Sequence, residues 1–372
     1  MADKNKHIEN SPEYKSLMVS SGVEKPSPVD AYSVKRFLGK KRNVLPVEEY
    51  VKGILSGDIA LLSKAVTLVE SSRPEHQRIA QEIIVQCLPS SGESIRIGIT
   101  GVPGVGKSTF IEVLGTYITK RGGKLAVLAI DPSSERTKGS ILGDKTRMEE
   151  LSVDKNAYIR PSPSAGSLGG VARKTRETII LCEAAGFNHI FIETVGVGQS
   201  ETAVHSMSDF FLLLMLAGAG DELQGIKRGI MEMADLIAIN KADGNNTEKA
   251  QLAKRQYKNA LHLFPRKESG WIPEVLTCSA LTQTGISDVW DKIELYKKQI
   301  TDNGYFNGNR KAQASFWLHE TIEENFKRSF YLHPVMREKI KEYEKRVLSS
   351  ELSSFAAAGE LFEIFSKLNK DI

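Results

Sequence analysis

Six short apolar runs, most of them separated by helical stretches, are the feature that most constrains the fold of this chain. The runs lie at 95–100, 125–130, 189–193, 209–216, 234–240 and 273–279, and the helical stretches at 107–121, 171–186, 247–264 and 286–300. Near-continuous apolar strands that alternate with helices indicate an α/β fold with a mostly parallel sheet covered on both faces. Because ligands bind at the carboxyl ends of such strands, we expect the functional residues in the loops that follow these runs.

The regions before and after this α/β pattern differ from it in composition and in hydrophobic periodicity. Residues 1–45 are polar, contain Pro26 and Pro28, and show no sustained hydrophobic periodicity. This composition predicts an N-terminal arm. Residues 46–92 carry three apolar helical stripes, and residues 304–372 are again helical after the α/β domain at 93–303. Periodicity leaves open whether the C-terminal helices pack on the parent sheet or bury their apolar stripe against a second subunit.

Composition excludes several classes of function. The net charge of +4, from 50 basic and 46 acidic residues, does not suggest a nucleic-acid-binding protein. No segment reaches the ~18 uninterrupted apolar residues expected of a membrane span. The N-terminal residues resemble neither a secretory signal nor a transit peptide, and the three cysteines form no CxxC pair, so we expect a cytoplasmic protein with reduced core thiols.

The segment "GVPGVGKST" follows the first apolar run directly and fits the phosphate-binding pattern G-x-x-x-x-G-K-[ST]. Glycines let backbone N–H groups turn toward a polyphosphate, and the next helix offers its N-terminus to the same anion. Lys107 is expected to neutralise the β- and γ-phosphates, and the Ser108 hydroxyl to coordinate Mg²⁺. The predicted nucleotide contacts here are Gly101, Val102, Pro103, Gly104, Val105, Gly106, Lys107, Ser108 and Thr109.

Two later segments predict which base is bound. In "NKAD" (240–243), Asp243 can accept hydrogen bonds from guanine N1–H and N2–H₂, for which adenine has no counterpart. The Lys241 stem can lie against the base while Asn240 ties the loop down. In "CSAL" (278–281), Ser279 and Ala280 would contact guanine O6 through the backbone, and Leu281 completes the segment. The sequence therefore favours GTP and GDP over adenine nucleotides.

The segment "FIETVG" places Glu193 at the end of an apolar strand, where an acid can hold Mg²⁺ through water. Gly196 would offer its N–H to the γ-phosphate. Asp131 and Asp144, in the loop that follows 125–130, are further candidates for the metal, with a solvated surface loop as the alternative. The loop at 217–229, which includes Lys227, also fits this nucleotide site. The alternative is a loop that simply begins a helix.

The residue that orients the attacking water is less clearly marked. Small GTPases carry a glutamine directly after the switch glycine, but Val197 occupies that place here and Gln199 comes later. We therefore expect slow intrinsic hydrolysis that a partner accelerates by ordering these loops.

With these motifs in hand, residues 46–372 closely resemble the MeaB/ArgK-type GTPases, bacterial relatives of the human methylmalonic aciduria type A protein. The blocks that carry the resemblance are "GITGVPGVGKST", "DPSS", "GSILGDKTRM", "RPSPSAGSLGG", "ETVGVGQSE", "AGAGDELQGIK" and "NKAD". The resemblance implies a P-loop GTPase of the signal-recognition class that acts as a chaperone of adenosylcobalamin-dependent methylmalonyl-CoA mutase. Such a protein gates cofactor loading, protects the mutase, and is stimulated by it.

The resemblance also implies roles for individual segments. Ser108, Asp131, Asp144 and Glu193 become the metal-side residues, and residues 131–147 and 193–199 become the first and second switches. The loop at 216–227, with Lys227, becomes a third switch that relays the nucleotide state to the mutase. Lys107, Glu193, Gln199 and Lys227 are the residues expected to act in hydrolysis or its control, and residues 304–372 become a dimerisation arm of a homodimer.

Three alternative functions remain on sequence grounds. An ATP-dependent kinase or transport ATPase would need adenine selectivity, which "NKAD" disfavours. A nickel-delivering GTPase for metalloenzyme maturation would be expected to carry His- or Cys-rich tracts, but the seven histidines and three cysteines are scattered. The client could also be a different acyl-CoA mutase, or the protein could be a nucleotide-regulated scaffold.

Overall fold

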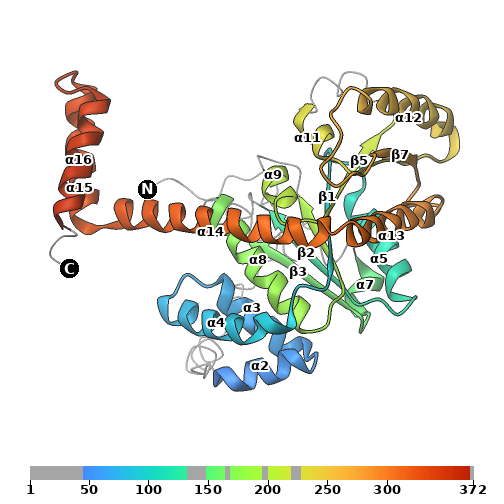
Figure 1. Cartoon of the computed structure of the whole chain (residues 1–372), viewed down its shortest axis with the longest axis horizontal. Coiled ribbons are helices and arrows are strands. Elements are labelled where there is room, and N and C mark those ends of the chain that lie inside the picture. Colours follow the sequence, from blue (N-terminus) through green and yellow to red (C-terminus); the bar gives the residue numbers. More distant parts are fainter. Residues whose placement is uncertain (1–44, 132–147, 164–167, 195–199, 219–227, 369–372) are drawn as a thin grey trace, which may run out of the picture. The chain divides into compact units, whose positions relative to one another are not determined.

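The computed structural model describes residues 45–131, 148–163, 168–194, 200–218 and 228–368. These residues contain a seven-stranded, wholly parallel sheet with the order β3-β2-β4-β1-β5-β6-β7 (Figure 1). The strands are β1 (Ile95–Gly101), β2 (Leu125–Asp131), β3 (Ala157–Pro163), β4 (His189–Thr194), β5 (Phe210–Leu216), β6 (Leu236–Asn240) and β7 (Glu274–Thr277). Parallel pairing throughout means that all the strands end at one edge of the sheet.

Helices cover both faces of the sheet. They are α5 (Lys107–Thr119), α7 (Glu149–Val153), α8 (Leu168–Ala184), α9 (Ser200–His205), α11 (Arg228–Met233), α12 (Thr247–Leu261) and α13 (Ile286–Asp302). Alternate residues of β1 show how the faces are used. Ile95, Ile97 and Ile99 are buried in one core with α5 and α13, whereas a Cβ on Gly98 would lie 2.8 Å from Val204 of α9.

The prediction of an α/β fold with a mostly parallel sheet is confirmed, and the six apolar runs correspond to β1, β2, β4, β5, β6 and β7. Sequence analysis missed β3. This strand lies at the edge of the sheet and pairs with β2 alone. Its residues Ile159, Arg160 and Pro161 are only partly buried, so the strand shows no continuous apolar run.

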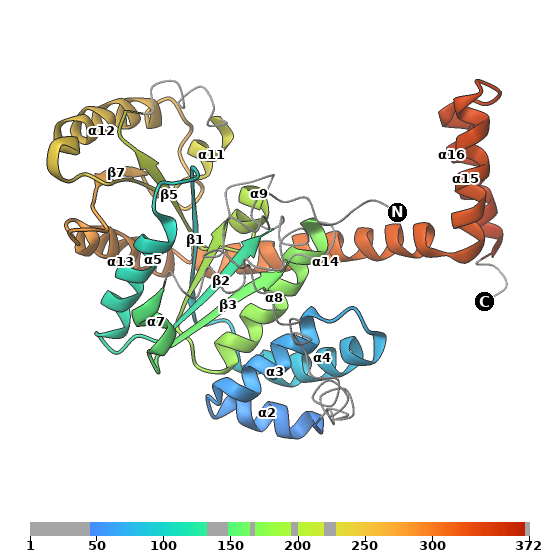
Figure 2. The ribbon, with the colours of Figure 1, turned by 180° about the vertical axis from the view of Figure 1, so that it is seen from behind.

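Three N-terminal helices pack against one another and against α8 (Figure 2). They are α2 (Val47–Leu55), α3 (Ile59–Glu70) and α4 (Pro74–Cys87), and the short 3-10 helix η2 (Leu88–Ser90) follows. Arg160 of β3 forms an ion pair with Glu70 at the end of α3, which ties this helical region to the sheet. The predicted arm at 1–45 lies outside the described residues except for Leu45, and the predicted domain boundaries stay predictions.

The C-terminal region consists of α14 (Tyr305–Leu332), α15 (Pro334–Leu348) and α16 (Ser354–Leu368). Helix α14 packs against α8 and α13, and α15 and α16 pack against each other (Figure 1). The two last helices share a small core of Met336, Tyr343, Ala357, Leu361 and Phe365. No helix in the described part of the chain is long and apolar enough to cross a membrane.

A buried network of charges fixes α14 to the sheet. The Arg310 guanidinium makes two hydrogen bonds of 2.6 Å to the Asp209 carboxylate, and it lies 3.5 Å from Glu183 Oε1. Glu183 also accepts two hydrogen bonds from Arg96 of β1, at 2.9 and 3.0 Å. Burial raises the pKa of Glu183, but the two guanidinium groups outweigh it, so this pKa lies below its usual value.

Replacing Glu183 with alanine is expected to lower the free energy of unfolding by about 3–5 kcal/mol at pH 7, because the largely buried Arg96 loses its carboxylate partner and Arg310 keeps only Asp209. Since the folded-state pKa of Glu183 is depressed, its contribution is present above the unfolded pKa of about 4.3 and is lost as the pH falls through the folded value. Urea unfolding at a series of pH values from about 7 down to about 2 measures both effects, with the pH-dependent loss expected below about pH 4.3. The matched variant Glu344→Ala, at an exposed site on α15, should change stability by less than about 0.5 kcal/mol; an equal loss in both variants would contradict the role of the network.

Candidate functional site

The predicted phosphate-binding residues form the loop between β1 and α5, at the edge of the sheet where the strands end (Figure 1). Strand β1 is central, with β4 on one side and β5 on the other. The ends of β4 and β6, which carry Glu193 and Asn240, lie at the same edge. The sequence-predicted residues of three separate motifs therefore come together around one loop.

Two glycines of this loop lie where an added side chain would be strained or crowded. Gly106, with φ of +91°, is in the left-handed region, and a Cβ there would lie 3.1 Å from Asn240 Nδ2. At Gly101 a Cβ would lie 2.4 Å from the carbonyl oxygen of Leu214 on β5. At these two positions the loop therefore passes close to its neighbours on β5 and β6.

The Lys107 side chain lies within the loop. Its Nζ donates to the carbonyl oxygen of Gly101 at 2.9 Å, and the residue is only 9% exposed. Burial lowers the pKa of the ammonium group, while the carboxylates of Glu193 and Glu201 oppose that shift. A desolvated cation at the start of a helix is suited to binding an anion that replaces its lost hydration.

Glu193 lies beside Ser108, the second residue of α5. The Ser108 hydroxyl donates to Glu193 Oε1 at 3.4 Å, and Glu193 is 6% exposed between β1 and β2. A hydroxyl and a carboxylate are the hard oxygen donors that Mg²⁺ prefers, so this pair fits the predicted metal. Asp131 ends β2 at the same edge, but its side chain lies outside what the structure describes.

Asn240 joins the base-recognition loop to the phosphate loop. Its amide nitrogen donates to the Val105 carbonyl at 2.9 Å, and its amide oxygen accepts from the Ala280 N–H at 3.1 Å. Lys241, with φ of +58°, reaches back to donate to the Gly104 carbonyl at 2.8 Å. These contacts set the predicted base site at a fixed distance from the predicted phosphate site.

The Asp243 carboxylate is held from one side by the buried hydroxyl of Ser279, which donates to Oδ2. The hydroxyl of Ser279 in turn accepts from the Thr282 N–H at 3.1 Å, which fixes its direction. Ala280 is buried, whereas Leu281 is 81% exposed beside this loop. Asp243 is thus oriented by a hydroxyl group. Among the described residues it forms no ion pair, and its other carboxylate oxygen is available to accept from a ligand.

Four of the predicted site residues lie outside the described residues: Asp144, Gly196, Gln199 and Lys227. Sequence analysis also missed three residues that support the site. The hydroxyls of Thr100 and Thr194 are 2.8 Å apart and link the ends of β1 and β4, and Asn246 Nδ2 donates to the Lys241 carbonyl at 2.7 Å. The only signal for the threonines was a polar residue at the end of an apolar run.

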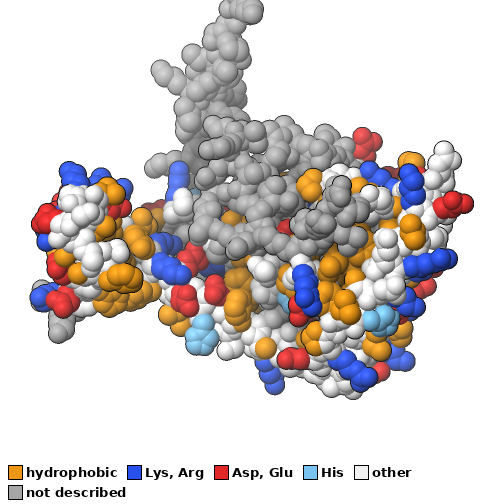
Figure 3. Space-filling view, turned by 90° about the horizontal axis from the view of Figure 1, so that it is seen from above, with side chains coloured by type: hydrophobic (Ala, Val, Ile, Leu, Met, Phe, Trp, Pro, Cys, Tyr) orange, Lys and Arg blue, Asp and Glu red, His pale blue; other side chains and the backbone are white. Residues whose placement is uncertain are grey.

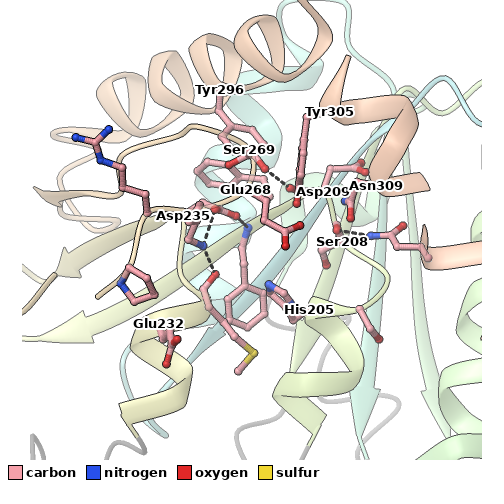
Figure 4. A pocket seen from close by; sticks show the side chains of 18 of the residues that line it. His205, Ser208, Asp209, Glu232, Asp235, Glu268, Ser269, Tyr296, Tyr305 and Asn309 are labelled. Atoms are coloured by element: carbon pink, nitrogen blue, oxygen red, sulfur yellow. Dashed lines mark hydrogen bonds and ion pairs between the residues drawn. The ribbon is translucent and has the colours of Figure 1, made fainter. Parts of the chain in front are cut away.

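A pocket of about 470 Å³ lies at the edge of the sheet where the strands begin, opposite to the edge that carries the phosphate loop (Figure 4). It is lined by residues that precede β5 and β6, including Asp209 and Asp235, and by Tyr305 and Asn309 of α14. It contains none of the phosphate- or base-loop residues. Among the described residues, no group of three or more His, Cys, Asp or Glu is arranged to hold a metal ion.

Comparison with known proteins gives a consistent result. A family model described as "Methylmalonyl Co-A mutase-associated GTPase MeaB" matches residues 62–333. A "Probable GTPase" from Mycobacterium tuberculosis is 49% identical over 318 residues, which cover 86% of this chain and 95% of the relative. The mouse "Methylmalonic aciduria type A homolog, mitochondrial" is 45% identical over 329 residues, covering 86% of this chain and 79% of that protein.

A solved structure is similar over nearly the whole of the chain. The crystal structure of a protein named "LAO/AO transport system kinase" is 36% identical, has a TM-score of 0.71, and covers 87% of this chain and 100% of its own.

Replacing Gly106 with alanine is expected to weaken binding of a fluorescent guanine nucleotide by about tenfold or more. The new Cβ meets Asn240 and requires an unfavourable backbone angle. Gly122 is a matched control, because its φ of +85° imposes similar strain but a Cβ there meets nothing within 4 Å. Gly122→Ala should lose stability without losing nucleotide affinity; similar affinity losses in the two variants would show that strain alone is responsible.

Proposed function

Because this chain belongs to the MeaB family of methylmalonyl Co-A mutase-associated GTPases, we propose that it is a Mg²⁺-dependent GTPase that acts as a chaperone of adenosylcobalamin-dependent methylmalonyl-CoA mutase. It would bind GTP, hydrolyse it slowly alone and faster with the mutase, and couple the cycle to cofactor loading and protection of the mutase. The observation that carries the nucleotide part of the proposal is the linkage of the Asp243 loop to the phosphate loop through Asn240.

Guanine selectivity is supported by the orientation of Asp243. Ser279 occupies one carboxylate oxygen, so the other can accept from guanine N1–H and N2–H₂. Adenine offers an acceptor at N1 and no donor at C2, and it would leave the carboxylate unpaired. The stem of Lys241 and the exposed side chain of Leu281 would flank the base, and Ala280 would contact guanine O6 through its backbone.

The chemistry expected of the remaining residues is electrostatic. Lys107 would move from the loop carbonyls to the β- and γ-phosphates, because a charged phosphate is a stronger acceptor than a carbonyl. Ser108, Asp131, Asp144 and Glu193 would hold Mg²⁺, which supplies charge neutralisation of the phosphates when bound. Gly196 would donate its N–H to the γ-phosphate, Gln199 would orient the attacking water, and the loop with Lys227 would relay the nucleotide state to the mutase.

Self-association would use the C-terminal arm. Leu318, Ile322 and Phe326 recur at four-residue steps along α14 and are 60%, 55% and 50% exposed. Hydrophobic side chains also lie on the surface of the C-terminal helices in Figure 3. An apolar stripe of this length is suited to a second copy of the same helix in a homodimer, since symmetric assemblies are the common form of self-association.

GTP hydrolysis by the purified protein, alone and with the host mutase, tests the proposal directly. We expect slow turnover alone and a clear increase with the mutase, with ATP a poor substrate. Asp243→Asn should raise the KM for GTP by about tenfold or more and improve the use of XTP, because xanthine carries a carbonyl where guanine has its amino group.

Different results would point to different functions. GTP turnover that the methylmalonyl-CoA mutase leaves unchanged would indicate another client, such as a different acyl-CoA mutase or a metalloenzyme. A preference for ATP over GTP would contradict the assignment of Asp243 and would favour a kinase or transport ATPase, the name carried by the similar crystal structure.

Replacing Ile322 with aspartate is expected to convert the proposed dimer to a monomer, because the variant places a charge in the centre of the apolar stripe. Lys327→Asp introduces the same carboxylate at an exposed site on a different face of α14 and should leave the dimer intact. Light scattering coupled to gel filtration measures both masses. A monomeric wild-type protein, or a dimer in Ile322→Asp, would contradict the use of this stripe.

A further inference from the structure

One face of α14 holds the turn that joins α9 to β5, residues 206–209. Trp317 Nε1 donates to the Ser206 carbonyl at 3.2 Å, and Gln313 Nε2 donates to the Ser208 carbonyl at 2.7 Å. Arg310 completes the set with its two hydrogen bonds to the Asp209 carboxylate. The spacing of 310, 313 and 317 places the three side chains on one side of the helix.

The turn is itself tightly joined to α9. Ser206, Met207 and Ser208 donate their backbone N–H groups to Thr202, Val204 and His205, and the Ser208 hydroxyl donates to the Val204 carbonyl at 2.6 Å. Helix α9 and the turn both pack on β1, where a Cβ on Gly98 would lie 2.8 Å from Val204 of α9 and 2.6 Å from Ser208 Oγ of the turn. A shift of the turn therefore moves the whole short helix.

The first residue of α9, Ser200, comes directly after the predicted second switch at 193–199. The upstream end of that segment is fixed by β4, which ends at Thr194, and its downstream end by α9. The geometry points to Gln313 and Trp317 as positioning residues for GTP hydrolysis. By holding the turn they set the position of α9, whose first residue, Ser200, is joined to the proposed second switch.

This role rests on the proposed function, since it requires residues 193–199 to act on bound GTP. Under this inference, α14, in the C-terminal arm, helps to position residues that act in GTP hydrolysis. Trp317 is directly followed by Leu318, the first residue of the proposed dimer stripe, so the same helix carries the contact with the 206–209 turn and the proposed contact with a second copy. Assembly and hydrolysis are thereby linked through one rigid element.

Two variants remove a donor while keeping the shape of the side chain. Gln313→Glu leaves an isosteric carboxylate that cannot donate to the Ser208 carbonyl at neutral pH, and Trp317→Phe keeps a ring against Arg176, whose guanidinium lies 4.4 Å from the Trp317 ring centroid. Each is expected to lower kcat by about three- to tenfold, the equivalent of one hydrogen bond. The KM for GTP should stay within about twofold, because the phosphate and base loops are untouched.

The control is Thr321→Val, which removes a hydrogen bond of similar length, from Thr321 Oγ1 to the Trp317 carbonyl at 2.7 Å, without touching the turn. It should leave both kcat and KM within about twofold of the wild type. The double variant Gln313→Glu, Trp317→Phe should lose less than the product of the single losses, because both residues act through the same turn. An unchanged kcat in the single variants, or an equal loss in Thr321→Val, would overturn the inference.

Tryptophan emission gives an independent readout that a purely structural role would not alter. We expect the emission to differ between the GDP-bound protein and the protein with a non-hydrolysable GTP analogue, and this difference to be lost in Trp317→Phe, although Trp271 and Trp290 remain. A full difference in that variant would overturn the inference. If Trp317→Phe does not fold, the wild-type spectra and the kinetics of Gln313→Glu still decide. A wild-type protein that binds no GTP would refute the proposed function instead.

Discussion

The position of β1 in the middle of the parallel sheet is the constraint on which the rest of the structure depends. The chain moves outward from β1 to β2 and β3, returns to insert β4 beside β1, and then continues on the other side with β5, β6 and β7. The direction of winding changes at β1, and loops that leave in opposite directions open a crevice at such a point. The phosphate loop follows β1 directly, so the topology alone places it between Glu193 and Asn240.

The two edges of the sheet serve different purposes. At the edge where strands end, polar side chains are oriented by hydrogen bonds but keep acceptors or charges available, as Asp243 and Lys107 do. At the edge where strands begin, the two buried aspartates are fully engaged. Asp209 accepts from the Arg96 N–H and from Arg310, and Asp235 accepts from the Phe211 N–H and from Lys267. A satisfied acid of this kind stabilises the fold but has little capacity left for a ligand.

Sequence predicted those parts of the fold and site that depend on neighbours along the chain. Strands β4, β5 and β6 can be recognised in the sequence because both of their faces are buried, which gives continuous apolar runs. The phosphate loop can be recognised because its glycines and Lys107 lie close together in the chain. Strand β3 was missed because Arg160 and Pro161 interrupt its apolar residues. The bond between Thr100 and Thr194, and the ion pair between Arg310 and Asp209, join residues 94 and 101 positions apart. Nothing local distinguishes such residues from ordinary polar ones.

The route between the two edges is limited by the sheet itself. Each central strand is hydrogen-bonded on both sides, so sliding one strand would break two ladders at once. A helix that lies on the sheet is held by side-chain packing and can shift as a rigid body at lower cost. Helix α9 begins at the nucleotide edge, ends beside Asp209, and spans only six residues, about 9 Å. The turn that follows it is held by α14, so within the described residues α9 directly connects the predicted second switch with the C-terminal arm.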